Sequence, residues 1–226
     1  MVEEFQRFAV YYAPPEGSDL ARAGAAWLGW DADEGAAVTH PDLGLDLARI
    51  TETPRKYGLH GTLKPPMRLA CPAASFLDAV ETLAQGLAPV AIGTLRLRPL
   101  EGFLALLPKP QPQGLTDAAA RIVQSLDPCR APLSEPELAR RRAAGLSLRQ
   151  EDLLQHWGYP YVMDEFRFHV TLTGRLDPAG MSDALRAAHA WFGPALQMPQ
   201  TLDALCVFGE DEGGRFHLIR RVPLRG

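Results

Sequence analysis

The sequence of 226 residues contains few cysteines and neither a long apolar run nor a polar low-complexity tract. Its three cysteines are odd in number and have no metal-ligand spacing, so we expect reduced thiols rather than a disulfide framework or a zinc site. No stretch approaches the roughly 18 consecutive apolar residues of a membrane span. Residues 1–4 are acidic where a signal peptide would be basic. A cytoplasmic protein with no membrane partner is the expectation.

Excess positive charge is also lacking, since the net charge is −4 and the isoelectric point is near 5.9. This balance argues against a nonspecific binder of long nucleic acid, but it leaves room for a small phosphorylated ligand held by a local basic cluster. The sequence has no Gly-x-x-x-x-Gly-Lys loop, no Gly-x-Ser-x-Gly elbow and no Gly-x-Gly-x-x-Gly fingerprint. We therefore expect no cofactor and no bound metal.

Two short stretches with the same lettering stand out: His60-Gly61-Thr62-Leu63 and His169-Val170-Thr171-Leu172. Each lies in a segment with the pattern of a β-strand, where residues two apart point to the same face. In each copy, one face is therefore apolar and the other carries a histidine, a threonine and basic residues. The apolar face packs on a core, and the polar face is expected to line a cleft.

The order of elements after each copy is the same. A helical pattern follows at residues 74–87 in the first half and 181–191 in the second, and two strand-like runs come after each helix. This repetition predicts an α+β fold produced by internal duplication. With 46% hydrophobic residues, the chain forms one bilobal domain, with lobes at about 1–110 and 111–226 and a connector near 108–115.

Local signals place the remaining elements. Residues 5–13 form a first strand, and Ser18 caps the helix after it. Capping boxes that begin at Ser134 and Ser147 open two further helices. Residues 31–53, which are rich in Gly, Pro and Asp, are expected to form a loop with one short helix and are the natural candidate for a lid.

The repeated motif suits phosphoryl chemistry. One imidazole can take a proton from the attacking oxygen while a second gives a proton to the leaving oxygen, and both titrate near neutral pH. The hydroxyls of Thr62 and Thr171 can donate to phosphate oxygens, and Lys64 and Arg167, on the same strand faces as the histidines, can stabilise the phosphate charge. The alternative is that these are polar positions on the solvent side of a half-exposed sheet.

Paired His-x-Thr strands in a duplicated α+β chain resemble the two-histidine (2H) phosphoesterase superfamily. The first motif with its surroundings, Tyr57-Gly58-Leu59-His60-Gly61-Thr62-Leu63-Lys64-Pro65-Pro66, and the strand that ends at Tyr11-Tyr12-Ala13-Pro14-Pro15 resemble a branch found beside bacterial phosphonate-utilisation genes. The resemblance implies two lobes related by a pseudo-two-fold axis, antiparallel sheets lining a central cleft, and helices packed outside. It also implies that His60 and His169 are the acid and base, and that Thr62 and Thr171 bind the phosphate.

Several further residues are weaker candidates for substrate binding. Tyr57, Tyr11 and Tyr12 can stack on a base or sugar, although tyrosines at the edge of a core are the commoner case. Arg7 and Arg55 are candidate phosphate ligands. The arginines at 140–142 fit the exposed face of a helix most simply, and contact with a polyanionic substrate is the alternative.

The sequence therefore predicts a metal-independent phosphoesterase that opens or hydrolyses a cyclic or small phosphodiester tied to ribose, nucleotide or phosphonate metabolism. Its partner is a small phosphorylated substrate, and a monomer is expected. Two alternatives stay open. One is processing of RNA ends, by hydrolysis of a terminal cyclic phosphate or by 2′-5′ ligation. The other is a non-catalytic sensor that binds a phosphorylated metabolite in the same cleft.

Overall fold

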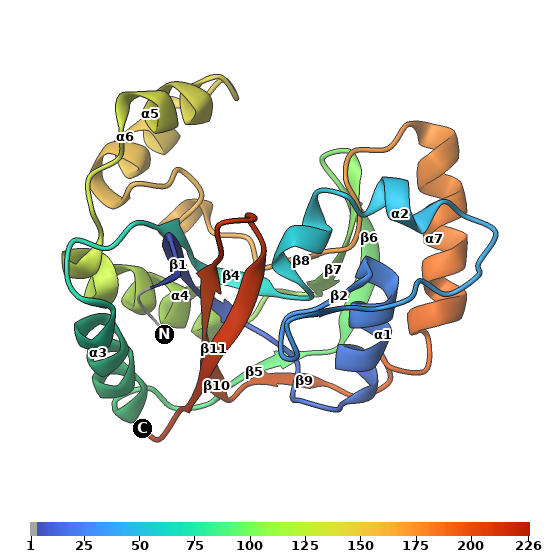
Figure 1. Ribbon diagram of the computed structural model, residues 1–226, viewed down its shortest axis with the longest axis horizontal. Helices are drawn as coiled ribbons and strands as arrows, with labels where there is room; N and C mark the ends of the chain where they lie inside the picture. The colour runs from blue at the N-terminus through green and yellow to red at the C-terminus, as the bar shows by residue number, and fades with distance from the viewer. Residues whose placement is uncertain (1–3) are drawn as a thin grey trace.

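A computed structural model describes residues 4–226 of the chain. One antiparallel sheet of seven strands forms its centre, in the order β11-β10-β1-β4-β8-β7-β6 (Figure 1). The strands of this sheet are β1 (Arg7–Tyr12), β4 (Gly61–Met67), β6 (Leu95–Leu100), β7 (Phe103–Pro108), β8 (Val170–Thr171), β10 (Ala204–Glu210) and β11 (Phe216–Pro223). The predicted α+β class with antiparallel strands is confirmed, and the strands form one continuous sheet across both lobes.

The two motif strands lie side by side at the middle of this sheet, because β4 pairs directly with β8. The hairpin that follows β4 in the chain, β6-β7, extends the sheet beyond β8, and the hairpin that follows β8, β10-β11, extends it beyond β1 and β4. The hairpin from the first half of the sequence therefore lies next to the second motif strand, and the hairpin from the second half lies on the side of the first motif strand. The division of the chain into lobes at about 1–110 and 111–226, with a connector near 108–115, stays a prediction.

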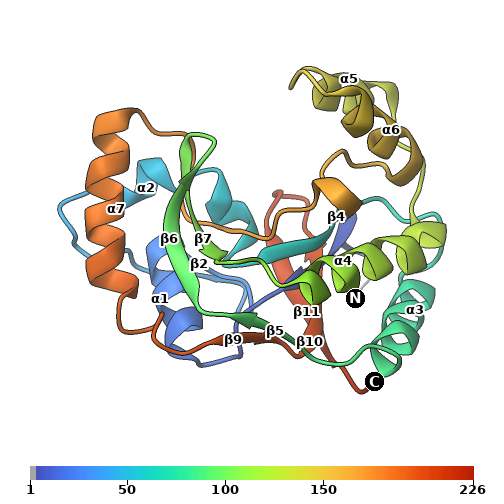
Figure 2. The same cartoon turned by 180° about the vertical axis from the view of Figure 1, so that it is seen from behind.

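Helices cover one face of the sheet on each side of the centre. α3 (Ala73–Gln85) contacts β10 and β11, α4 (Gln113–Leu126) contacts β4, and α7 (Pro178–Phe192) contacts β6 and β7 (Figures 1 and 2). On β1, Phe8, Val10 and Tyr12 belong to the main core on this face, whereas Tyr11 packs in a smaller cluster on the opposite face. The predicted helices at 74–87 and 181–191 are confirmed to within a few residues.

The cap residues explain where several helices begin. Ser18 accepts a hydrogen bond from the amide of Ala21 at the start of α1 (Asp19–Leu28). Both predicted capping boxes are present, at Ser134 before α5 (Glu135–Arg142) and at Ser147 before α6 (Leu148–Trp157). Figure 2 shows α5 and α6 standing out from the body beyond α4. We call this pair the α5–α6 arm.

The other elements are short. The segment 31–53 contains one strand of a small hairpin, the last residue of the other strand, and one helical turn. The rest is the loop that its composition predicts. The remaining elements are β2 (Trp30–Asp31), β3 (Ala36–Ala37), α2 (Leu47–Ile50), β5 (Val90–Gly93) and β9 (Gln200–Leu202), with the 3₁₀ turns η2 (Pro54–Tyr57), η3 (Asp127–Cys129) and η4 (Met163–Glu165). None of the helices within residues 4–226 combines the length and the apolar character needed to cross a membrane. Of the N-terminal stretch 1–4 that bears on the signal-peptide prediction, residues 1–3 lie outside the described part.

Candidate active site

The two motifs face each other across the β4–β8 pairing. Gly61 is opposite Val170, and continuing this antiparallel register by one residue places Thr171 opposite His60 and Thr62 opposite His169. The histidines then occupy the diagonal of a rectangle whose other two corners are the threonines. Diagonal neighbours of this kind on one face of a sheet lie about 7–8 Å apart.

Each histidine makes the same local hydrogen bond. His60 Nδ1 lies 3.0 Å from the carbonyl oxygen of Gly58, and His169 Nδ1 lies 2.8 Å from that of Arg167. A carbonyl oxygen only accepts, so Nδ1 carries the hydrogen in both rings. The neutral imidazoles therefore keep Nε2 as an unprotonated acceptor, which is the form that a general base needs.

Burial sets the protonation of both rings. It lowers the pKa of His60 to about 4, although the bond to Gly58 raises it; the nearby imidazole of His169 lowers it further. Burial also lowers the pKa of His169. The hydrogen bond to the Arg167 carbonyl and the charge of the Glu101 carboxylate raise this pKa, but burial has the larger effect. Both histidines are therefore neutral at pH 7, and a proton on one disfavours a proton on the other.

The cleft above the motifs consists of two adjoining chambers. The larger, about 670 Å³, is lined by His60 and Thr171 and is called the His60 chamber. The smaller, about 330 Å³, is lined by His169 and is called the His169 chamber. Four residues line both chambers: Thr62, Pro65, Phe103 and Tyr159. Together the chambers have the size of an ordinary small-molecule site.

The second motif is held by neighbours more than by strand pairing, since β8 is only two residues long. The amide of Phe168 donates to the Gln111 side chain at 2.8 Å, and the amide of Leu172 donates to the Leu104 carbonyl at 2.9 Å. Trp27 Nε1 donates to the Leu172 carbonyl at 2.9 Å. These contacts fix the backbone on both sides of His169. The alternation of faces predicted for this segment is present from Phe168 to Leu172, although the regular strand is shorter than expected.

Lys64 is not on the face of His60 and Thr62, and that expectation is wrong. The register between β1 and β4 shifts on both sides of the Val10–Lys64 pair, so a bulge turns Lys64 to the side of Val10. There its Nζ donates to the Val123 carbonyl at 3.0 Å and lies 3.5 Å from Asp127. Burial lowers the pKa of Lys64 to about 8. Lys64 therefore joins β4 to the end of α4 and lies outside both chambers.

The aromatic candidates divide into two groups. Tyr11 is fully buried with its ring 4.1 Å from that of His60, and Tyr57 lies 5.4 Å from the same ring and stacks on Phe216. Both line the His60 chamber. Tyr12 points into the core, where its hydroxyl donates to the side chain of Gln200 at 2.8 Å. It takes no part in lining the cleft.

The arginine candidates also divide. Arg7 lines the His60 chamber and is paired with Glu210 on the neighbouring strand. Arg167 lines the His169 chamber, 3.5 Å from Glu101. Arg55 is used elsewhere, because its guanidinium donates to the backbone carbonyls of the α1–α2 region. Arg55 therefore shapes the loop before the first motif and does not line the cleft.

Three further arginines line the His60 chamber together with Arg7. For two of them substrate contact was only the alternative prediction, and the third was not a candidate. They are Arg140 and Arg141 from α5 and Arg175 just after the second motif. The guanidinium of Arg141 lies 4.9 Å above the ring of Tyr159, another lining residue that the sequence pattern did not indicate. The helix around residues 140–142 is present as predicted, but the sequence carries no signal for which surface this helix covers.

No group of three or more His, Cys, Asp or Glu side chains that could hold a metal ion occurs within residues 4–226. The three cysteines in this part of the chain are unpaired.

Gly61 is the residue of β4 that pairs with β8. A Cβ atom at this position would lie 2.5 Å from Cε2 of Phe168, beneath the cleft floor. We expect Gly61→Ala to lower the free energy of unfolding by about 1–3 kcal/mol through overpacking. It should also lower kcat, because β4 and β8 are pushed apart. Urea unfolding and steady-state kinetics measure both effects.

Gly114 provides the matched control for this substitution. It lies in the first turn of α4, and its nearest neighbour to an added Cβ is a side-chain atom of Val90 at 3.5 Å, an ordinary contact. Gly114→Ala should leave stability unchanged or raise it by up to about 1 kcal/mol, since alanine favours helix. Equal stability of Gly61→Ala and Gly114→Ala would contradict the close approach at the centre of the site.

A family model described as "Protein of unknown function (DUF1045)" matches residues 62–217. The chain belongs to the DUF1045 family. The match begins at Thr62 of the first motif and includes the whole of the second, so it spans the β4–β8 centre.

Two curated relatives of this DUF1045 chain carry the name ribose 1,5-bisphosphate phosphokinase PhnN. The protein from Janthinobacterium sp. (strain Marseille) is 36% identical over 235 residues, which cover 99% of this chain and 52% of the relative. The protein from Laribacter hongkongensis (strain HLHK9) is 37% identical over 223 residues, 96% of this chain and 52% of the relative. The chain thus spans about half the length of the curated relatives that it matches.

Among solved structures, a protein described as a phosphoesterase matches with a TM-score of 0.45 and 17% sequence identity, over 99% of this chain and 100% of that one. At this level of similarity, nothing about the chemistry of the DUF1045 chain follows from the match.

Proposed function

We propose that this chain is a phosphoesterase of the two-histidine kind that hydrolyses or opens a small cyclic phosphodiester, with His60 and His169 as acid and base. The observation that carries the proposal is the mirrored arrangement of the motifs. Two imidazoles with the same Nδ1 hydrogen bond stand diagonally across one strand pair, each opposite a threonine. This is the arrangement that in-line displacement at phosphorus requires, with one proton acceptor and one proton donor on opposite sides.

The reaction then proceeds as follows. Nε2 of one neutral histidine removes a proton from water as the water oxygen forms a bond to phosphorus. The bond from phosphorus to the ring oxygen breaks, and the other histidine, protonated at Nε2, gives its proton to that oxygen. Thr62 and Thr171 donate hydrogen bonds to the non-bridging oxygens, whose charge increases in the transition state. The product is a monoester, and the two histidines have exchanged protonation states.

The names of the curated relatives suggest a substrate class but not this reaction. Those proteins are about twice as long as the match, and this sequence has no Gly-x-x-x-x-Gly-Lys-Ser/Thr loop, through which many kinases hold phosphates. We therefore assign no phosphokinase activity to this chain. The ribose 1,5-bisphosphate in their names supports a phosphorylated ribose, as a ribose or nucleotide cyclic phosphate, as the substrate.

The test is ³¹P NMR of the purified protein with EDTA present, against a panel of 2′,3′-cyclic nucleotides and ribose 1,2-cyclic phosphates. We expect a cyclic phosphate signal to convert to a monoester signal with the wild type and not with the His60→Ala/His169→Ala double variant. Conversion only without EDTA would contradict metal independence. If the ³¹P signals shifted on binding but no compound of the panel were converted, the chain would be a sensor of a phosphorylated metabolite and not an esterase. The arginines of the His60 chamber could bind the phosphate of such a metabolite as well.

A further inference from the structure

The His60 chamber carries more positive charge than one reacting phosphodiester needs. Four arginines line it, Arg7, Arg140, Arg141 and Arg175, and within residues 4–226 only Arg7 among them has an ion pair, with Glu210. The whole chain has a net charge of −4, so this concentration of guanidinium groups is local. A cyclic phosphodiester carries a single negative charge, and the threonines and histidines of the floor already supply its contacts.

Arg140 and Arg141 differ from the next arginine of the same helix. Arg142 is held by Glu151 through its Nε and Nη2 atoms, at 3.1 and 2.7 Å from the same carboxylate oxygen. Neither Arg140 nor Arg141 forms an ion pair with any residue in 4–226. The Nε atom of Arg141 is buried and has no hydrogen-bond partner there, while its guanidinium plane lies over Tyr159. A buried donor without a partner is costly to a fold, and an anionic oxygen is the partner that it fits best.

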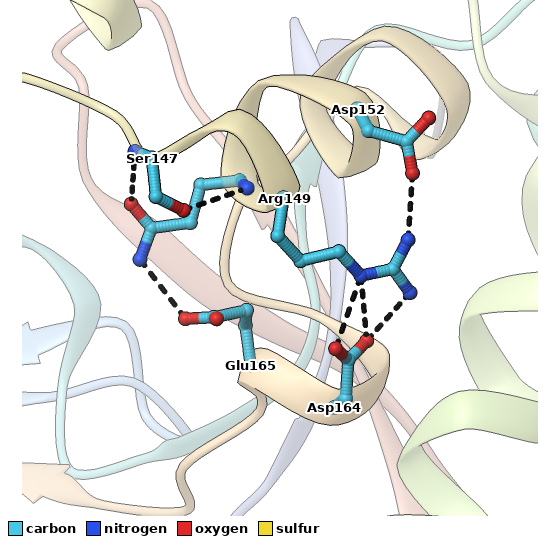
Figure 3. Close-up of polar contacts among 6 residues, drawn as sticks. Ser147, Arg149, Asp152, Asp164 and Glu165 are labelled. Carbon is cyan, nitrogen blue, oxygen red and sulfur yellow. Dashed lines mark hydrogen bonds and ion pairs between the residues drawn. The ribbon is translucent and has the colours of Figure 1, made fainter.

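The α5–α6 arm is held in place by contacts that do not use these two arginines. Figure 3 shows Arg149 of α6 paired with Asp152 and Asp164. The side chain of Gln150, next along the helix, donates to Glu165 at 2.9 Å. Asp164 and Glu165 belong to η4, directly before the segment that carries His169. The side chains of α6 therefore attach the arm to η4, and the Arg142–Glu151 pair joins α5 to α6. From this arm, α5 presents Arg140 and Arg141 to the cleft.

We propose that Arg140 and Arg141 form a second anion subsite, which binds a monoester phosphate of the substrate while the cyclic phosphate reacts at the histidines. The substrate is then a sugar cyclic phosphate that carries a separate phosphate group. Guanidinium groups suit this role because their planar donors match phosphate oxygens in pairs. The identity of the reaction rests on the proposed function, whereas the subsite itself rests only on the arginines and the chamber.

Matched pairs of compounds test the subsite. We compare ribose 1,2-cyclic phosphate with its 5-phosphate, and 2′,3′-cyclic AMP with its 5′-phosphate, by kcat/KM. The wild type should prefer the phosphorylated member of at least one pair. Arg141→Ala should reduce that preference about 10- to 100-fold, as expected for the loss of a charged hydrogen bond, with Arg140→Ala acting in the same direction. Arg141→Lys, which keeps the charge but not the fork, should fall between Arg141→Ala and the wild type.

Arg142→Ala is the matched control, because it removes the same charge from the same helical turn outside the chamber. It should keep the preference within about twofold, as is usual for an exposed ion pair. If Arg142→Ala and Arg141→Ala lost the preference equally, the subsite would be overturned. The preference would then depend on the total charge of the α5–α6 arm and not on particular arginines. A wild type without preference for either phosphorylated compound would overturn it too.

Binding separates this inference from the proposed reaction. In the His60→Ala/His169→Ala background, calorimetric titration with the same pairs should show tighter binding of the phosphorylated member, and Arg141→Ala should abolish the difference. If that result appeared while the wild type turned over no compound, the reaction would be wrong and the subsite would stand. Turnover with a preference that both arginine variants left unchanged would support the reaction and overturn the subsite.

Discussion

Replacement of either His60 or His169 by alanine should lower kcat on a cyclic phosphate by about 10²- to 10⁴-fold, the usual contribution of a general acid or base. The reason lies in the register at Gly61 and Val170, which places the two imidazoles diagonally across one strand pair. In the proposed reaction they act on the same phosphate from opposite sides. Neither histidine has a neighbouring histidine that could substitute for it in its own chamber. The double variant should lose little more than the worse single variant, because the two groups act in one step. Single-turnover kinetics followed by ³¹P NMR measure these losses.

The fold must survive for this result to bear on mechanism. Each imidazole makes one hydrogen bond, to a backbone carbonyl, so thermal melts of the variants should stay close to that of the wild type. His189→Ala is a suitable control, since His189 is exposed on α7 and outside both chambers. If either His60→Ala or His169→Ala kept nearly full activity with an unchanged melting temperature, the assignment of the two histidines as acid and base would be wrong.

Local signals in the sequence were sufficient for the motif and for most elements around it. Ser18, Ser134 and Ser147 begin helices where their capping patterns place them, because these hydrogen bonds involve residues only three apart. The alternation correctly placed Phe168, Val170 and Leu172 on the core face, whereas Phe166, expected there too, lines the His169 chamber. Such features depend only on residues within a few positions of one another in the sequence.

Features that depend on distant segments were beyond the sequence pattern. Lys64 follows His60 and Thr62 at even spacing, yet a bulge against β1 turns it into the core, and nothing within β4 itself announces that shift. The exchange of hairpins between the two halves of the sheet is likewise set by long-range pairing.

The arginines of α5 illustrate a third limit. Consecutive helical residues are about 100° apart, so the side chains of residues 140–142 spread over about 200° around the helix. The simplest prediction, that all three lie on its exposed face, did not show which of them line the cleft. Which of them do so depends on how the arm attaches to η4 and on the pairing of Arg142 with Glu151. The helix was predictable, and the role of its arginines was not.

The pH dependence of kcat/KM should be bell-shaped with its optimum below about pH 6.5, the usual pKa of histidine. Catalysis needs one neutral and one protonated histidine, and burial lowers the pKa of both, that of His60 to about 4. Above the pKa of the acid, the fraction of enzyme that carries the required proton falls about tenfold per pH unit. From the optimum to about pH 8.5, kcat/KM should therefore fall by about 100-fold or more.

The substrate for this measurement should have no monoester phosphate. A cyclic diester stays singly ionised throughout the pH range, so the profile reports only groups of the enzyme that titrate. Bound substrate places negative charge between the imidazoles, which favours their protonated forms and raises their pKa values. The alkaline limb of kcat should therefore lie at higher pH than that of kcat/KM. An optimum of kcat/KM above about pH 7.5 would mean that the histidines in solution are not the buried neutral pair of the structure. If the limbs of kcat and kcat/KM coincided, the phosphate would not lie between His60 and His169 when it reacts.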